Sequence, residues 1–104
     1  MNITRESEKL LCCMYKIYLD RRKNNISRSE AKTFDDDFYS SEKQLEKYSD
    51  SDISDCLEEL EQKSYIKSDV LDNVELTNDT IIYMENRFIN GAKEVLDFLC
   101  NFIP

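Results

Sequence analysis

The sequence predicts a mainly α-helical α+β domain with one small β-ribbon, and two observations predict it. Between residues 49 and 63, apolar residues recur at helical spacing behind a Ser-x-x-Asp start, which is typical of a capped amphipathic helix. Residues 65–76 then form two short runs about Asp72-Asn73, which is typical of two strands joined by a tight turn. A helix followed by such a ribbon is the core of a winged helix-turn-helix. We expect that fold as a single domain over residues 1–104, with an additional C-terminal amphipathic helix at about 91–103.

The predicted helix at residues 49–63 is strongly acidic outside its apolar stripe. Ser49 suits the N-cap, and Ile53, Leu57 and Leu60 recur on one face. In a DNA-reading protein of this fold, the same helix would enter the major groove, where phosphates would repel its carboxylates. We therefore expect a protein-binding acidic face, with a merely solvated surface as the alternative. This face consists of Asp52, Asp55, Glu58, Glu59 and Glu61.

The ribbon that follows the helix carries little positive charge. Its strands are expected at residues 65–70 and 74–76, with Lys67 as the only cation. Two strands alone are marginally stable in water, so they have to pack against the helices. A wing that touches DNA usually offers more basic side chains than this one.

The composition of the whole chain favours a globular protein with acidic character. The 104 residues include 22 acids and 14 bases, for a net charge of −8, and 40% are hydrophobic. This charge opposes non-specific binding to nucleic acid or to an anionic membrane. The sequence has no apolar run long enough to span a membrane and no signal-peptide pattern at its start, so we expect a cytoplasmic protein.

A long first helix is predicted from about Thr4 to Arg22, and a short second helix from Arg28 to about Phe34. The first has a wide apolar face that is typical of a central core helix, and the second begins with a Ser27-x-x-Glu30 capping box. Residues 20–32 hold five bases and two acids, for a net charge of +3. This basic patch is the best candidate for a phosphate contact, although its bases also complement helix dipoles and aid solubility. Its bases are Arg21, Arg22, Lys23, Arg28 and Lys32.

Residues 35–61 have the opposite charge, with eleven acids, two bases and a net charge of −9. Residues 35–37 are expected in a loop that Phe38 and Tyr39 anchor on the core. Residues 41–44 form another candidate capping box, for a short helix to about Lys47 with Leu45 turned inward. A long acidic connector of this kind suits contact with a protein better than insertion into a DNA groove.

The chain is expected to end in two more helices. Thr77 suits the cap of a helix from about Asn78 to Arg87, and residues 90–91 mark a break before a helix from Ala92 to about Phe102. The last helix has a wide apolar face, which either closes the core or meets a second subunit; we favour a dimer or partner contact. The candidate contact residues are Leu96, Leu99, Phe102 and Ile103.

We expect no metal site, no cofactor and no enzyme activity. The chain has no histidine, and its four cysteines form no Cys-x-x-Cys pair, so small buried thiols are the simplest interpretation. Residues 50–61 imitate part of a calcium loop, but Asp55 stands where that loop needs glycine. The residue sets of the usual nucleophilic and acid–base sites are also missing.

The second half of the chain resembles small bacterial and phage winged-helix proteins of the YjcQ-like kind. The resemblance rests on Leu57-x-x-Leu60, Ser64-Tyr65-Ile66, a short wing, and the segment from Leu76 to Arg87 followed by an amphipathic tail. That family usually has glycine where Ser64 and Thr80 stand. The resemblance implies a winged-helix fold and no particular activity or catalytic residue.

Two functions are consistent with these patterns. The first is a non-catalytic acidic winged-helix protein, of bacterial, phage or mobile-element type, that acts as a regulatory or protein-interaction module. The second is a DNA-binding transcriptional regulator that grips phosphates with the basic patch at residues 21–32, helped by dimer formation.

Overall fold

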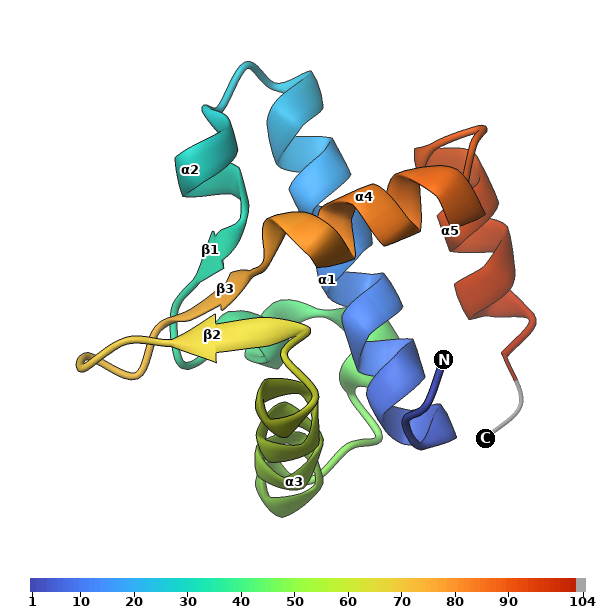
Figure 1. Ribbon diagram of the computed structural model, residues 1–104. Helices are drawn as coiled ribbons and strands as arrows, with labels where there is room; N and C mark the ends of the chain where they lie inside the picture. Colours follow the sequence, from blue (N-terminus) through green and yellow to red (C-terminus); the bar gives the residue numbers. More distant parts are fainter. Residues whose placement is uncertain (103–104) are drawn as a thin grey trace.

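The protein is mainly helical with one small antiparallel sheet, as a computed structural model that describes residues 1–102 shows (Figure 1). Within these residues, five α-helices, two 3-10 turns and three strands follow one another. In order they are α1 (Arg5–Lys23), α2 (Arg28–Ala31), β1 (Thr33–Phe34), η1 (Phe38–Ser41), η2 (Lys43–Leu45), α3 (Asp50–Gln62), β2 (Ile66–Ser68), β3 (Val74–Leu76), α4 (Asn78–Arg87) and α5 (Ala92–Cys100).

Helix α1 is the central element, as its wide apolar face predicted. It contacts all four other helices, and in Figure 1 the sheet, α2 and α3 lie on one side of it and α5 on the other, while α4 crosses it. Its inward residues form the largest part of the hydrophobic core: Leu10, Leu11, Cys12, Cys13, Met14, Tyr15 and Tyr18 are all buried. None of the helices within residues 1–102 has both the length and the apolar character needed to span a bilayer.

Local capping explains where the helices begin and end. The side chains of Thr4, Ser49 and Thr77 accept hydrogen bonds from the first turns of α1, α3 and α4, and Ser49 with Asp52 forms the full capping box that was predicted. At its C-terminal end, α3 stops in a Schellman motif with Ser64 at a left-handed φ of 66°. There the Ser64 N–H donates to the Glu61 carbonyl and the Tyr65 N–H donates to the Leu60 carbonyl.

The sheet has three strands in the order β1-β3-β2, both pairs antiparallel. Strand β2 pairs with β3 through Ile66↔Leu76, and β1 pairs with β3 through Phe34↔Val74. The sequence did not predict β1, because α2 was expected to continue to about Phe34. The helix instead ends at Ala31, since the free edge of β3 offers backbone partners to residues 32–34 and Phe34 becomes fully buried there.

Two smaller expectations about turns are wrong. The segment after Ser41 begins with no side-chain cap and forms the 3-10 turn η2, although Leu45 is buried as predicted. The hairpin turn is wider than an Asp-Asn pair: the side chain of Asp69 accepts from the Leu71 and Asn73 N–H groups, and Asp72 takes a φ of 64°. The Asp69 N–H donates to the Asn73 carbonyl at 2.9 Å, so residues 70–72 form a three-residue loop that ends in the left-handed Asp72, a common hairpin solution. Strand β2 accordingly ends at Ser68, two residues before the predicted limit.

The last two helices are separate elements. Helix α4 ends at Arg87, and α5 begins after Gly91, whose φ of 79° turns the chain. Helix α5 packs against α1 and ends at Cys100, two residues before the predicted limit.

Candidate functional site

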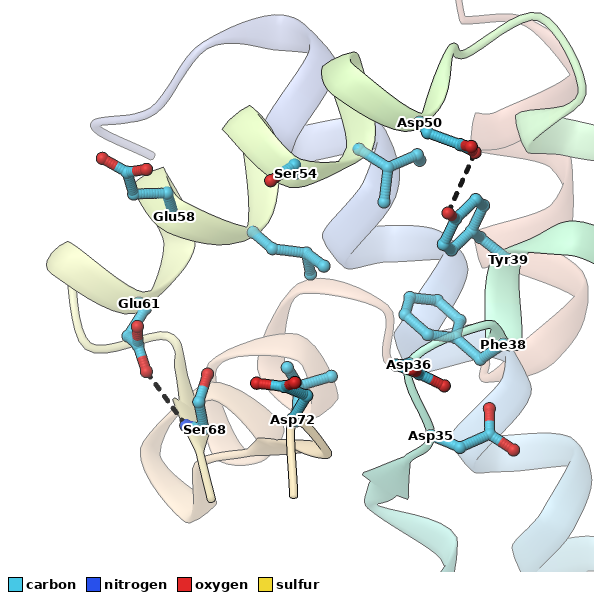
Figure 2. A pocket seen from close by; sticks show the side chains of 13 residues that line it. Asp35, Asp36, Phe38, Tyr39, Asp50, Ser54, Glu58, Glu61, Ser68 and Asp72 are labelled. Carbon is cyan, nitrogen blue, oxygen red and sulfur yellow. Dashed lines mark hydrogen bonds between the residues drawn. The ribbon is translucent and has the colours of Figure 1, made fainter. Parts of the chain in front are cut away.

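A hollow lies between α3, η1 and the β2–β3 hairpin (Figure 2). It has a volume of about 420 Å³, in the lower part of the range of roughly 300–1,000 Å³ that is typical of binding pockets. We call it the acidic groove. Its lining residues are Asp35, Asp36, Phe38, Tyr39, Asp50, Ile53, Ser54, Leu57, Glu58, Glu61, Ser68, Asp72 and Val74.

The walls of the acidic groove are carboxylates without cations. No lysine or arginine lines it, and within residues 1–102 no salt bridge reaches any of its acids. Three of the acids accept hydrogen bonds inside the fold: Asp50 from the Tyr39 hydroxyl at 3.0 Å, Glu61 from the Ser68 N–H at 3.0 Å, and Glu58 from the Gln62 side-chain amide at 3.4 Å. The six acids are Asp35, Asp36, Asp50, Glu58, Glu61 and Asp72.

The floor of the groove is apolar. Phe38, Ile53 and Val74 are buried there, and Leu57 is half-buried. Helical spacing places Ile53 and Leu57 on successive turns of one face of α3, next to Glu58 and Glu61. The groove therefore offers an apolar surface bordered by negative charge.

The negative potential of this region acts on Tyr39. The pKa of the Tyr39 hydroxyl is raised, first by its hydrogen bond to Asp50, then by desolvation, and further by the charges of Asp50, Asp36 and Asp37. Each carboxylate opposes the phenolate form, because a second negative charge nearby is unfavourable. The tyrosine consequently stays a neutral hydrogen-bond donor.

The six carboxylates do not converge on one point. Among residues 1–102, no three His, Cys, Asp or Glu side chains are close enough together to hold a metal ion. The stretch that imitated a calcium loop is the helix α3, so its acids point in several directions rather than into one loop. The charges are spread along the groove.

The five acids of the predicted acidic face of α3 lie in four different environments. Glu58 and Glu61 line the groove, whereas Asp55 is exposed outside it and Asp52 belongs to the capping box. Glu59 points the other way and binds the start of α1: its carboxylate accepts from the N–H of Thr4 at 2.9 Å, the Thr4 hydroxyl at 2.8 Å and the Ser7 hydroxyl at 2.5 Å.

The contacts of Glu59 have an electrostatic consequence. They lower its pKa, with the Ser7 hydrogen bond as the largest cause, because each donor favours the charged form. Glu59 is therefore a structural residue that the sequence pattern could not separate from its neighbours.

Four groove acids were not singled out as site residues, Asp35, Asp36, Asp50 and Asp72, although the first three lie within the acidic stretch 35–61 that was expected to contact a protein. The first two lie in the predicted acidic connector, and Asp72 was expected only to form a turn. The acidic run before Phe38 was a usable signal for Asp35 and Asp36. Asp72 carried no such signal, because the fold alone brings the hairpin beside α3.

The basic patch lies at the end of α1 that is farthest from α3. Helix α3 is bound to Thr4 and Ser7, whereas Arg21, Arg22 and Lys23 form the last turn of α1 (Figure 1). With a helical rise of about 1.5 Å per residue, these two ends are separated by roughly 27 Å. We call residues 21–32 the basic end.

Two of the five predicted phosphate-binding residues hold the fold together. Arg21 donates to the carbonyls of Ala31 at 3.2 Å and Thr33 at 2.8 Å, and its guanidinium lies 4.6 Å from the centre of the Phe34 ring. Lys32 forms a salt bridge of 3.3 Å with Glu75. The other three, Arg22, Lys23 and Arg28, are exposed, although Arg22 also donates to the Ile26 carbonyl at 3.0 Å.

The predicted contact residues of the last helix have different environments. Leu99 is 2% exposed and belongs to the core, which agrees with the alternative that the last helix closes the core. Leu96, in contrast, is 38% exposed. Phe102 is half-buried and meets the Phe98 ring edge-on. Ile103 lies outside the described residues.

The cysteines are free thiols, and three of them are buried. Burial raises the pKa of Cys12 and Cys13 to about 12, which keeps both protonated at neutral pH. Since the thiolate is the nucleophile, these two residues are suited to the core rather than to chemistry.

No protein-family model, curated protein or solved structure matches this chain. Its function has to be inferred from the charges and shape of the molecule itself.

Proposed function

We propose that the chain is a non-catalytic winged-helix protein that binds a partner protein through the acidic groove and regulates that partner. The order of elements supports the winged-helix assignment: a short strand, a turn segment, α3 and a hairpin follow one another, and β1 completes the sheet beside β3. In this assignment α3 takes the place of the helix that reads DNA in helix-turn-helix proteins.

The charge of α3 argues against DNA as the ligand of that helix. Its 13 residues include six acids and no base, and the adjacent groove adds Asp35, Asp36 and Asp72. Phosphates would be repelled along the whole surface, whereas a basic protein surface would be attracted and steered towards it. The observation that carries the proposal is this groove, in which six carboxylates face solvent without a single lysine or arginine.

Capture from a bacterial lysate, with charge-reversed variants, tests the proposal. The groove variant is Glu58→Lys with Asp72→Lys, and the matched control is Glu46→Lys with Asp55→Lys, two exposed acids outside the groove. Both variants change the net charge equally. We expect partners that the wild type and the control retain and the groove variant loses, as identified by mass spectrometry. Equal capture by all three proteins would contradict the proposal.

A DNA-binding regulator is the second candidate, because Arg22, Lys23 and Arg28 are exposed together at the basic end. Its test is binding to random-sequence duplex across a salt series. If these bases grip phosphates, replacing all three by alanine should reduce the slope of log K against log salt by about 2.7, or roughly 0.9 for each contact. Absence of binding at low salt would eliminate this candidate.

A further inference from the structure

We infer that the acidic groove receives a basic segment of the partner, which places an apolar side chain on the floor between flanking lysines or arginines. The inference rests on the proposed function and specifies the chemistry of the partner. It combines three features of the groove: dispersed charge, an apolar floor and blocked sheet edges.

The dispersed charge favours several cations over one. The six carboxylates come from the loop after β1, from α3 and from the hairpin, and no three converge on a metal-sized site within residues 1–102. Figure 2 shows Glu58 and Glu61 on one side of the hollow, Asp35 and Asp36 on the other, and Asp72 between them. A chain with several separate basic side chains can neutralise both walls, which a single ion cannot do.

The apolar floor favours a peptide over a simple polycation. Leu57 is half-buried, so a part of its side chain remains open to solvent between acidic walls. An apolar side chain seated there would remove water from the floor, worth roughly 25 cal/mol for each Å² of apolar surface buried. The aliphatic stems of the flanking lysines or arginines would cover more of the same surface.

Backbone groups on both edge strands of the sheet already have hydrogen-bond partners, which favours recognition of the bound segment through its side chains. On the outer edge of β2, the Ser68 N–H already donates to Glu61, and at β1 the Thr33 carbonyl accepts from Arg21. An added strand would have to displace these groups before it could pair with the backbone. These two contacts favour recognition through the charges and apolar side chains of the bound segment.

Fluorescence anisotropy with synthetic peptides tests the inference directly. The probes are three labelled peptides of about a dozen residues, each with one leucine and with lysines and arginines at a different spacing from it. Each has a matched peptide with serine in place of the leucine and another with glutamates in place of the bases. We expect at least one basic leucine peptide to bind, the serine version to bind about tenfold more weakly, and the glutamate version not to bind.

Variants of the protein locate the binding surface. The groove pair Glu58→Gln with Asp72→Asn should weaken binding about tenfold at low salt, whereas the control pair Glu46→Gln with Asp55→Asn should change it less than about twofold. Leu57→Ser should weaken binding of the leucine peptide and leave the weak binding of the serine peptide unchanged. The serine peptide already tests the floor on the unmodified protein, so the conclusion holds even if Leu57→Ser fails to fold.

Several outcomes would overturn the inference. They are binding by none of the peptides, equal binding of the leucine and serine peptides, or equal losses in the groove pair and the control pair. Self-association that depends on both Glu58 and Arg28, measured by sedimentation, would instead identify the occupant as the basic end of a second copy.

The inference and the proposed function can fail separately. If the groove variant loses partners from the lysate but no peptide binds, the proposed function stands and the inference falls. If the groove variant keeps every partner and no peptide binds, both are wrong.

Discussion

The basic end and the acidic groove use their charges in opposite ways. At the basic end, Arg21 binds two carbonyls and the Phe34 ring, and Lys32 pairs with Glu75, so part of the positive charge stabilises the fold. In the acidic groove, six carboxylates share one hollow, and no salt bridge within residues 1–102 reaches them. At the basic end, contacts within the fold hold two of the five bases, whereas the carboxylates of the acidic groove have no cation as a partner within residues 1–102.

The difference shows why a run of charge in a sequence does not identify a binding surface. Both runs are equally visible in the sequence, and each was a candidate surface: the acidic run for contact with a protein, the basic run for contact with phosphates. What separates them is whether backbone carbonyls and opposite charges lie within reach in the folded chain. Charge that has no internal partner is the charge that an external partner can use.

The largest expected effect comes from removing Arg21. Arg21→Ala would leave the carbonyls of Ala31 and Thr33 without their donor and remove the cation from the Phe34 ring, so we expect the free energy of unfolding to fall by about 2 kcal/mol. Urea denaturation measures this change. The matched control is Lys23→Ala, an exposed base in the same turn that should change stability by less than about 0.5 kcal/mol. Equal effects of the two substitutions would mean that Arg21 acts only as a surface charge.

A smaller effect is expected at Glu59, whose neighbour in the chain serves as its control. Glu59→Gln removes the charged acceptor of Thr4 and Ser7, and we expect a loss of about 1 kcal/mol at pH 7. Glu58→Gln should have almost no effect on stability, because Glu58 accepts only one long hydrogen bond, of 3.4 Å from Gln62. Urea denaturation at neutral pH compares the two variants.

The pH dependence of the Glu59 variant has a definite sign. The pKa of Glu59 is lowered in the folded protein, so its contribution to stability is fully present above the unfolded value of about 4.5 and is lost as the pH falls through the folded value. The difference in unfolding free energy between the wild type and Glu59→Gln should therefore shrink below about pH 4.5. A difference that stays constant into acid would contradict the assignment of Glu59 as a charged acceptor.

The sequence predicted the elements that depend on neighbouring residues. Helices α3 and α4 begin after the expected caps, Ser49 and Thr77, because an N-cap needs only a hydroxyl and an N–H three residues later, and α1 begins within one residue of its expected start. Strand β1 was not predictable in this way, since its two residues are defined by pairing with β3, which lies about 40 residues further on. The same long-range pairing explains why α2 ends at Ala31 and not at about Phe34, as was predicted.

The candidate site was predicted only in part, for a related reason. Glu58 and Glu61 stood out as acids of the central helix, but Asp35, Asp36 and Asp72 join them only because the fold brings three segments together. Glu59 differs from Glu58 only through contacts with Thr4 and Ser7, more than 50 residues away in the sequence. A pattern of charges along one helix cannot contain that information.

The smallest expected effect has the opposite sign to the others. In the free protein the carboxylates of the acidic groove repel one another, so Glu58→Gln with Asp72→Asn should raise the free energy of unfolding by about 0.4 kcal/mol at low ionic strength. The gain should decline as salt is added from about 0.05 to about 1 M, where the screening length falls to about 3 Å. Asparagine also tolerates the left-handed backbone of residue 72, but that benefit does not depend on salt, so the salt series separates the two causes. A gain that is independent of salt would mean that the groove carboxylates do not repel one another in the free protein, and the contrast with the basic end would then lose its electrostatic basis.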